Sequence, residues 1–220
     1  MNLFDVMGPI MVGPSSSHTA GAVRIGQMAR KLLGNPPKVA EIYLHGSFAD
    51  TGKGHGTDRA LVAGLLGMET DNPNIPISFS IAKKEGLYIK IKTIKLRGVH
   101  PNSVLLKLKD ENGKEIEIIA SSLGGGKVKI NAVDGLEAGF SGEHPTLVIR
   151  NEDKPGMVAE VTLLLSQYKV NIATMQLYRN LRGEKAVMVI ESDQPINGEV
   201  LQMLRNCEGL VQVTYINMNE

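Results

Sequence analysis

The chain has 220 residues, of which 42% are hydrophobic and 21% are charged. It is too apolar for a disordered chain and long enough for two modest domains. Lys and Arg number 24 against 23 Asp and Glu, so no bulk charge attracts a nucleic acid or an anionic membrane. We therefore expect a soluble globular protein whose partners are small molecules and other proteins.

Cysteine usage and apolar runs bear on where the protein works. Cys207 is the only cysteine, which rules out an internal disulfide and fits a reducing cytoplasm. The first residues, which include Asn2 and Asp5, do not resemble a signal peptide, and every apolar run is too short for a membrane span. We expect a cytoplasmic protein without a membrane segment.

The first predicted domain, residues 1–140, begins with polar stretches that alternate with helices. Apolar residues recur at helical spacing across 25–33, and Gly34 should end that helix. A strand is expected at 39–45 and a second helix at 57–67, with a flexible polar turn between them. The domain thus starts as a mixture of helices and strands.

The remainder of the first domain has the alternation of strands. Apolar and polar residues alternate across 76–132, and Asn112-Gly113 is typical of a hairpin turn because both residues tolerate positive φ. The segment 134–144 contains three glycines and no sustained period, so we expect it to link two domains.

The second predicted domain, residues 146–220, has a simpler order of elements. Its pattern predicts a β-α-β-β-α-β sequence with strand, helix, strand, strand, helix and strand at 146–150, 157–168, 170–177, 186–190, 200–204 and 211–215. This is the ferredoxin-like order, so the chain is expected to be α+β.

The stretch GPSSSHTAG, residues 13–21, lies at the start of the first helix. One interpretation is that Ser16 or Ser17 only caps the helix; another is that the serines and free amides bind a carboxylate or phosphate. Three serines exceed what a cap needs, which favours binding. His18 beside the positive end of a helix is disfavoured as an imidazolium. A nucleophilic serine is disfavoured because there is no G-x-S-x-G elbow.

A second polar stretch, LHGSFADTGKGHGTDRA at 44–60, follows the predicted strand. It is not a phosphate-binding loop, because five residues separate Gly46 from Gly52 and Gly54 stands where Ser or Thr must bind magnesium. Zinc is also disfavoured, since the histidines and aspartates of the two stretches lack H-E-x-x-H spacing and no cysteine is near. Two histidine- and hydroxyl-bearing stretches at helix starts favour a shared carboxylate site.

The motifs GPSSSHTAG and GSFADTGKGHGTD resemble the signature of the iron-sulfur-dependent L-serine dehydratases, and the whole chain is similar to their separate beta subunit. In that family the beta-chain domain resembles the intervening substrate-binding domain of some phosphoglycerate dehydrogenases, which implies an α/β substrate-binding domain. Residues 144–172 look like an ACT domain, in which the turn 153–156 enters the first helix. The resemblance covers both predicted domains.

The resemblance implies a heterodimeric lyase that converts L-serine to pyruvate and ammonia. In the family a [4Fe-4S] cluster acts as a Lewis acid on the serine hydroxyl while a base removes the α-proton. A cluster needs several thiolates, and Cys207 alone cannot hold one. The cluster is therefore expected in the partner alpha subunit, with no metal site in this chain, which should be inactive alone.

On this hypothesis the active site lies where the two chains meet. The candidate catalytic residues are His18, His55 and Lys53. The candidate substrate-binding residues are Ser15, Ser16, Ser17, Thr19, Thr57 and Asp58. Whether His18 or His55 transfers the proton stays open, although His18 has the better electrostatic position.

The ACT-like domain offers a regulatory role and an alternative function. Its candidate contacts to a small amino-acid effector are Asn151, Gly156 and Asn171, and ACT-mediated homo-association is expected. The alternative is a non-catalytic amino-acid sensor in which both domains bind ligand. The doubled set of histidine- and serine-bearing stretches exceeds what a sensor needs and favours the enzyme.

Overall fold

A computed structural model of the chain describes residues 9–179 and 181–218. The chain divides into two compact units between Gly135 and Leu136, inside the segment expected to act as a linker. The predicted domains, 1–140 and 146–220, differ from these units only in where they place 136–145. The expectation about a leader concerns residues 1–8, which lie outside the described residues.

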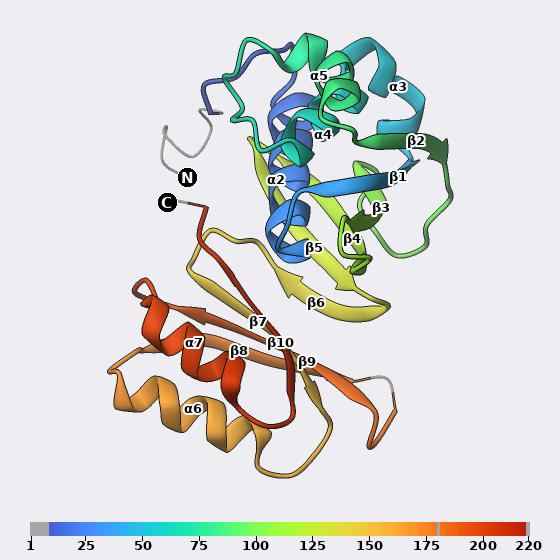
Figure 1. The fold of residues 1–220 in the computed structure, drawn as a ribbon. Coiled ribbons are helices and arrows are strands. Elements are labelled where there is room, and N and C mark those ends of the chain that lie inside the picture. Colours follow the sequence, from blue (N-terminus) through green and yellow to red (C-terminus); the bar gives the residue numbers. More distant parts are fainter. Residues whose placement is uncertain (1–8, 180, 219–220) are drawn as a thin grey trace. The chain divides into compact units, whose positions relative to one another are not determined.

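The first unit is built from one sheet and several helices (Figure 1). Its helical elements are η1 (Ser16–Ala20, a π-helical turn), α2 (Gly21–Leu33), α3 (Ser47–His55), α4 (Thr57–Leu65), η2 (Ile75–Ile77, a 3-10 turn) and α5 (Ser78–Lys84). Its strands are β1 (Pro37–His45), β2 (Tyr88–Thr93), β3 (Ser103–Asp110), β4 (Glu115–Gly124) and β5 (Lys127–Val133).

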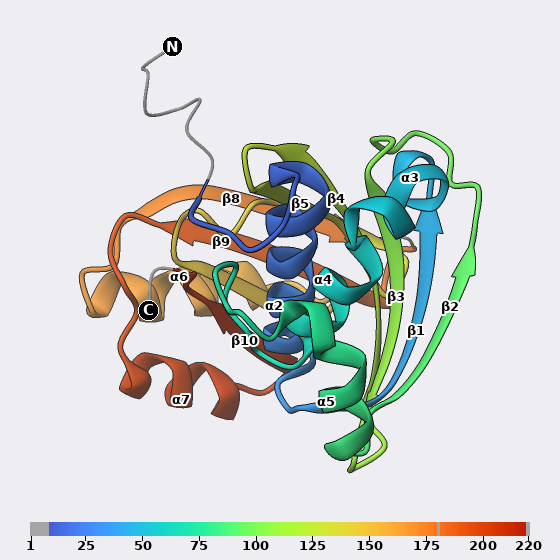
Figure 2. The same cartoon turned by 90° about the horizontal axis from the view of Figure 1, so that it is seen from above.

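The strands of the first unit follow the order β2-β1-β3-β4-β5. β1 pairs in parallel with β2 and antiparallel with β3, so that Ile42 lies beside Ile91 on one side and Leu106 on the other. Helices α2, α4 and α5 lie on the same side of β1, β2 and β3 (Figure 2). The buried residues of β1 alternate, as expected for a sheet with one face against helices.

Helices α2 and α4 approach each other at two glycines. A Cβ at Gly26 would lie 2.5 Å from the Leu61 carbonyl oxygen, and a Cβ at Gly64 would lie 2.0 Å from the Val23 carbonyl oxygen. Only glycine allows backbones to pack this closely. This contact holds α4 against the helix that follows η1.

The ends of the predicted elements agree only in part with the structure. Helix α2 ends at Gly34, which has a φ of 92°, as the sequence predicted. The flexible turn expected between β1 and α4 is wrong, because 47–55 forms helix α3. The strands expected from residue 76 onward begin only at Tyr88, after the helix α5.

The second unit opens with β6 (Leu136–Phe140), a strand in the segment expected to be an irregular linker. It continues with β7 (Thr146–Glu152), α6 (Met157–Gln167), β8 (Ile172–Arg179), β9 (Lys185–Ser192), α7 (Gly198–Asn206) and β10 (Leu210–Ile216). The antiparallel order β10-β7-β9-β8 and the β-α-β-β-α-β succession confirm the predicted ferredoxin-like fold.

The core of the second unit lies between its sheet and its two helices. Fully buried side chains come from the strands, as at Ile149 and Met188, and from the helices, as at Leu165 and Leu204. Within 9–179 and 181–218, no helix combines the length and the apolar character needed to cross a membrane.

Candidate functional site

The serine-rich stretch folds into a π-helical turn that runs directly into α2. Ser15, rather than the expected Ser16 or Ser17, is the N-cap: its Oγ accepts the His18 backbone N–H at 3.1 Å. The Gly21 N–H donates to the carbonyl of Ser16, five residues earlier, which widens the turn into a π-helix. Such turns are rare and are often found at functional sites.

Two glycines allow the turn to pack against its surroundings. Gly13 has a φ of 144°, and a Cβ there would lie 2.5 Å from Thr19 Cγ2. A Cβ at Gly21 would lie 2.1 Å from Ser122 Oγ on β4. The turn therefore packs closely between the chain before it and strand β4.

The second polar stretch forms helix α3 beside this turn. The chain enters α3 at Gly46, whose φ is 53° and where a Cβ would lie 2.6 Å from the Pro101 carbonyl oxygen. The fully buried Phe48 anchors the helix to the core. Gly56, with a φ of 69°, ends α3 and starts α4. These glycines let a short helix fold between β1 and α4.

The imidazole of His18 joins the two motifs. Its Nδ1 lies 3.2 Å from Ser17 Oγ in its own turn. Its Nε2 lies 3.1 Å from both Ser47 Oγ and Thr51 Oγ1 on α3. The ring meets Phe48 edge to face, with centroids 5.2 Å apart. Every polar atom of the ring is thus directed by a neighbour.

His55 is the last residue of α3, and its ring lies next to the ring of His18. The ring centroids are 4.9 Å apart. His55 Nδ1 lies 3.0 Å from the Thr51 carbonyl oxygen, which can only accept, so in the neutral ring Nδ1 carries the hydrogen and Nε2 has the lone pair. The Thr19 hydroxyl donates to the His55 carbonyl at 3.3 Å. The two histidines expected to serve one site are therefore neighbours.

Burial lowers the pKa of His18 below 6.5, and repulsion from His55 lowers this pKa further, while a backbone hydrogen bond at Ser47 opposes both. His18 is only 8% exposed. The sequence predicted a neutral ring because His18 lies near a helix terminus. The structure also lowers the pKa of His18, but burial is the main cause. A neutral imidazole can accept a proton near pH 7.

Comparison with known proteins places both motifs within the match to one family. A family described as the serine dehydratase beta chain matches residues 2–82, and the ACT domain family matches residues 146–209. A protein of Bacillus subtilis named as a probable L-serine dehydratase beta chain is 41% identical over 215 residues, covering 98% of this chain and 97% of that protein. The chain belongs to the L-serine dehydratase beta-chain family.

Further relatives extend the likeness. The L-serine dehydratase beta chain of Peptoniphilus asaccharolyticus is 40% identical over 216 residues, covering 98% of this chain and 97% of that one. A D-3-phosphoglycerate dehydrogenase of Archaeoglobus fulgidus is 28% identical over 203 residues, covering 90% of this chain but 37% of that protein. The expected likeness to part of the phosphoglycerate dehydrogenases is confirmed.

The other predicted site residues differ in how they are placed. Lys53 is exposed on α3. Asp58 is half-buried at the start of α4, where its Oδ1 accepts the Arg59 N–H at 2.8 Å. Thr57 is fully buried, and a Cβ at Gly52 would lie 3.2 Å from Thr57 Cβ. The burial of Thr57 favours packing beneath α3 over direct contact with a substrate.

Three site residues were missed by the sequence analysis as individual candidates. Ser47, Phe48 and Thr51 all contact the ring of His18. Their spacing of one and three residues places them on one side of a helix, but the glycines around them indicated a loop. Recognising α3 as a helix is the signal that would have found them.

The residues of this chain do not fit an iron-sulfur cluster. In the part of the chain that the structure describes, no group of three His, Cys, Asp or Glu side chains is arranged to hold a metal ion. Cys207 follows α7 in the second unit, where its Sγ lies 3.4 Å from the Met203 carbonyl oxygen. One isolated thiol cannot replace the several thiolates that a cluster requires.

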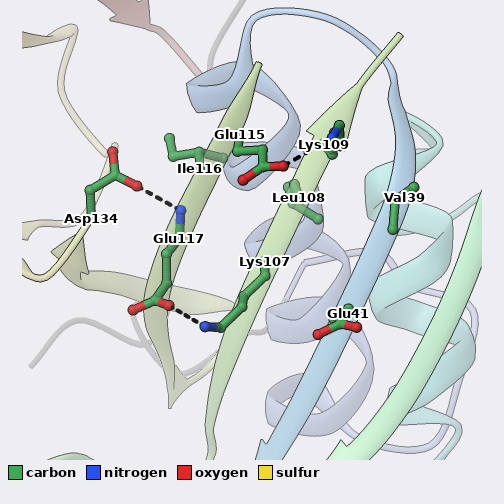
Figure 3. A pocket seen from close by; sticks show the side chains of 9 residues that line it. All are labelled: Val39, Glu41, Lys107, Leu108, Lys109, Glu115, Ile116, Glu117 and Asp134. Atoms are coloured by element: carbon green, nitrogen blue, oxygen red, sulfur yellow. Dashed lines mark hydrogen bonds and ion pairs between the residues drawn. The ribbon is translucent and has the colours of Figure 1, made fainter. Parts of the chain in front are cut away.

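A separate hollow of about 370 Å³ lies on strands β1, β3 and β4 (Figure 3). Two ion pairs between β3 and β4 lie along its floor. Lys107 Nζ is 2.8 Å from Glu117, and Lys109 Nζ is 3.1 Å from Glu115. None of the predicted site residues lines it. The charged side chains here pair with one another, as expected for a solvated sheet face.

The candidate effector residues of the second unit lie at opposite ends of α6. Asn151 is 2% exposed near the end of β7, and Gly156 precedes the helix with a φ of 96°. Asn171 follows the helix and lines a hollow of about 410 Å³ with Lys169. A helix of 11 residues is about 16 Å long. One small ligand cannot contact both ends in a single copy.

Proposed function

We propose that this chain is the beta subunit of a heterodimeric L-serine ammonia-lyase and supplies half of the active site. The reaction removes water from L-serine, and the aminoacrylate formed hydrolyses to pyruvate and ammonia. The observation that carries the proposal is the buried, hydrogen-bonded His18, held between the two family motifs and beside His55.

In this proposal the histidines handle the proton and the serines handle the carboxylate. His18 has a lowered pKa and is neutral near pH 7, as a general base must be. Ser15, Ser16, Ser17 and Thr19 lie in the same turn, at the positive end of the helix that continues into α2. Lys53 and His55 on α3 and Asp58 at the start of α4 are proposed to form the adjoining wall, with Thr57 packed beneath α3 as its support.

We assign the [4Fe-4S] cluster to the alpha subunit, because this chain has one cysteine. When bound there, the cluster supplies Lewis-acid chemistry at the serine hydroxyl. This chain contributes the neutral imidazole and the hydroxyl-rich turn that orient the substrate. We place the complex in the cytoplasm, where cluster thiolates stay reduced.

The second unit is proposed to bind a small amino-acid effector between two copies of the chain. Gly156 and Asn171 lie at opposite ends of α6, so two copies are needed to bring such residues to one ligand. Asn151 lies next to the β7–α6 turn and its Oδ1 is buried without a hydrogen-bond partner among the described residues. This favours ACT-mediated homo-association alongside the heterodimer.

Co-expression tests the proposal. The chain and its alpha partner are produced together without oxygen, with iron, and purified through a tag on this chain. We expect the two chains to co-purify as a brown complex that forms pyruvate from L-serine, and this chain alone to form none. If the chains do not associate, or if the complex is inactive while this chain binds amino acids alone, the amino-acid sensor replaces the enzyme.

A further inference from the structure

Thr51 makes a contact with His18 whose direction can be worked out from hydrogen counting. Thr51 Oγ1 lies 2.9 Å from the carbonyl oxygen of Ser47, one helical turn earlier, and 3.1 Å from His18 Nε2. A hydroxyl has one hydrogen, and a carbonyl oxygen can only accept. The hydrogen of Thr51 is therefore committed to its own helix, in the back-bonded form common for Thr.

This commitment decides which nitrogen of the neutral His18 ring carries hydrogen. Thr51 Oγ1 can offer Nε2 only a lone pair, so Nε2 must be the N–H that donates. The neutral imidazole has a single N–H, and Nδ1 is left with a lone pair. Ser17 Oγ, 3.2 Å away, then donates its hydrogen to Nδ1.

The remaining hydroxyl contacts agree with this direction. Ser15 Oγ lies 3.3 Å from Ser17 Oγ and accepts the His18 backbone N–H. Since the hydrogen of Ser17 points to Nδ1, the hydrogen of Ser15 can point to Ser17. A chain of donors thus runs from Ser15 through Ser17 and His18 to Thr51. Hydrogen bonds that run in one direction polarise and strengthen one another.

We propose that Thr51 is a positioning residue that holds the neutral ring of His18 with hydrogen on Nε2, so that Nδ1 is the nitrogen that accepts a proton. This inference rests on the proposed function for its catalytic meaning. The accepting nitrogen faces the serine-bearing turn expected to hold the substrate carboxylate. In the step, the Ser17 hydroxyl turns away from Nδ1, the substrate Cα–H bond breaks, the proton moves to the freed lone pair of Nδ1, and the electron pair stays on the substrate.

Ser47 cannot fix the ring in the same way. Its Oγ is also 3.1 Å from Nε2, but among the described residues no carbonyl oxygen binds its hydroxyl hydrogen. It lies 3.4 Å from Thr51 Oγ1 and can donate there or turn toward the ring. Ser47 therefore adapts to either form of the ring, whereas Thr51 accepts one. Without Thr51, Ser47 can donate to Nε2 and the other tautomer becomes populated.

Nitrogen NMR of the isolated chain tests the tautomer without any catalysis. The chain is labelled with 15N-histidine, and the ring nitrogens are observed at a pH where His18 is neutral. We expect protonated Nε2 and bare Nδ1 in the wild type and in Thr51→Ser, and a mixture in Thr51→Val. Protonated Nδ1 in the wild type, or an unchanged tautomer in Thr51→Val, overturns the proposal.

The fold is expected to survive these substitutions because Thr51 is exposed on α3. A matched control is Thr162→Val, since Thr162 Oγ1 donates at 2.9 Å to the Val158 carbonyl in α6, far along the chain from any histidine contact. This control should leave the His18 signals unchanged. It separates loss of a back-bonded threonine from loss of the contact to His18.

Turnover of the complex with the alpha subunit gives the second readout. Thr51→Val should lower kcat by about tenfold, which is less than the roughly 10²–10⁴-fold that a general base contributes, with KM little changed, and Thr51→Ser should restore kcat. A change in KM alone, or no recovery with serine, contradicts a positioning role. If His18 itself proves dispensable, the proposed function fails while the NMR result still decides the tautomer.

Discussion

The rings of His18 and His55 lie with their centroids 4.9 Å apart, although each comes from a different motif. The contact exists because η1, which begins at the Ser15 cap, packs beside α3, which begins after Gly46. Two neutral imidazoles tolerate this distance, whereas two imidazolium ions repel. Repulsion from His55 is accordingly one of the causes, after burial, that lower the pKa of His18.

The first prediction concerns pH and stability. The pKa of His18 lies below 6.5 in the folded chain, so the unfolded chain binds more protons as the pH falls below 6.5. Stability contributed by the neutral ring is present above that pH and is lost as the pH falls toward the folded pKa. The variant His18→Gln has no imidazole at this position, so the loss of stability caused by protonation of His18 is absent from it. Urea unfolding at several pH values should show the stability difference between wild type and variant shrinking from about pH 7.5 to about pH 5.5.

A difference that stays constant over this interval would contradict the lowered pKa. His144→Gln is the matched control, because His144 is an exposed histidine in the second unit. Its stability difference from the wild type should not shrink in the same way.

The second prediction concerns the packing of α2 on α4. Gly64→Ala places a Cβ 2.0 Å from the Val23 carbonyl oxygen, which is backbone and cannot rotate away. We expect the free energy of unfolding to fall by about 1–3 kcal/mol. Denaturant unfolding of the isolated chain measures it.

Gly54→Ala is the control for the helix propensity of alanine. Gly54 lies within α3, and a Cβ there meets no atom within 4 Å. This variant should be stabilised by about 0.5–1 kcal/mol. Equal effects of the two substitutions would show that the close approach of α2 and α4 is absent in solution.

The sequence predicted the second unit more fully than the first. Its strands and helices each keep one period, so the ferredoxin-like order followed from the pattern of apolar residues. In the first unit, α3 was missed because Gly52 and Gly54 weaken the helical signal. The helix forms because Phe48 is buried against the core and Thr51 bonds back to Ser47, which are tertiary and local contacts that a pattern of residue types does not reveal.

The sequence predicted that the two polar stretches lie together, but not the geometry by which His18 and His55 meet. Both motifs and the neutral character of His18 could be predicted, because helix starts rich in hydroxyls have known electrostatic consequences. The cap at Ser15 could not be predicted, because any of the three serines satisfies the pattern. The burial of Thr57 could not be predicted either, because it depends on the path of α3 over α4.

The third prediction concerns iron. The chain alone, incubated with iron and sulfide without oxygen and then desalted, should retain no cluster, because its one cysteine lies in the second unit. Visible absorption and iron analysis measure this. Iron and sulfide retained in stoichiometric amounts would contradict the assignment of the cluster to the alpha subunit.

The fourth prediction is the loss of turnover when His18 is removed from the intact complex. In the complex of this chain with its alpha partner, His18→Ala should leave association and the brown colour intact, while His144→Ala, at an exposed histidine, keeps full activity. The decisive measurement is serine-dependent pyruvate formation by the His18→Ala complex. The account predicts a loss of at least about 10²-fold; full turnover would remove His18 from the mechanism and contradict the claim that this chain supplies half of the active site.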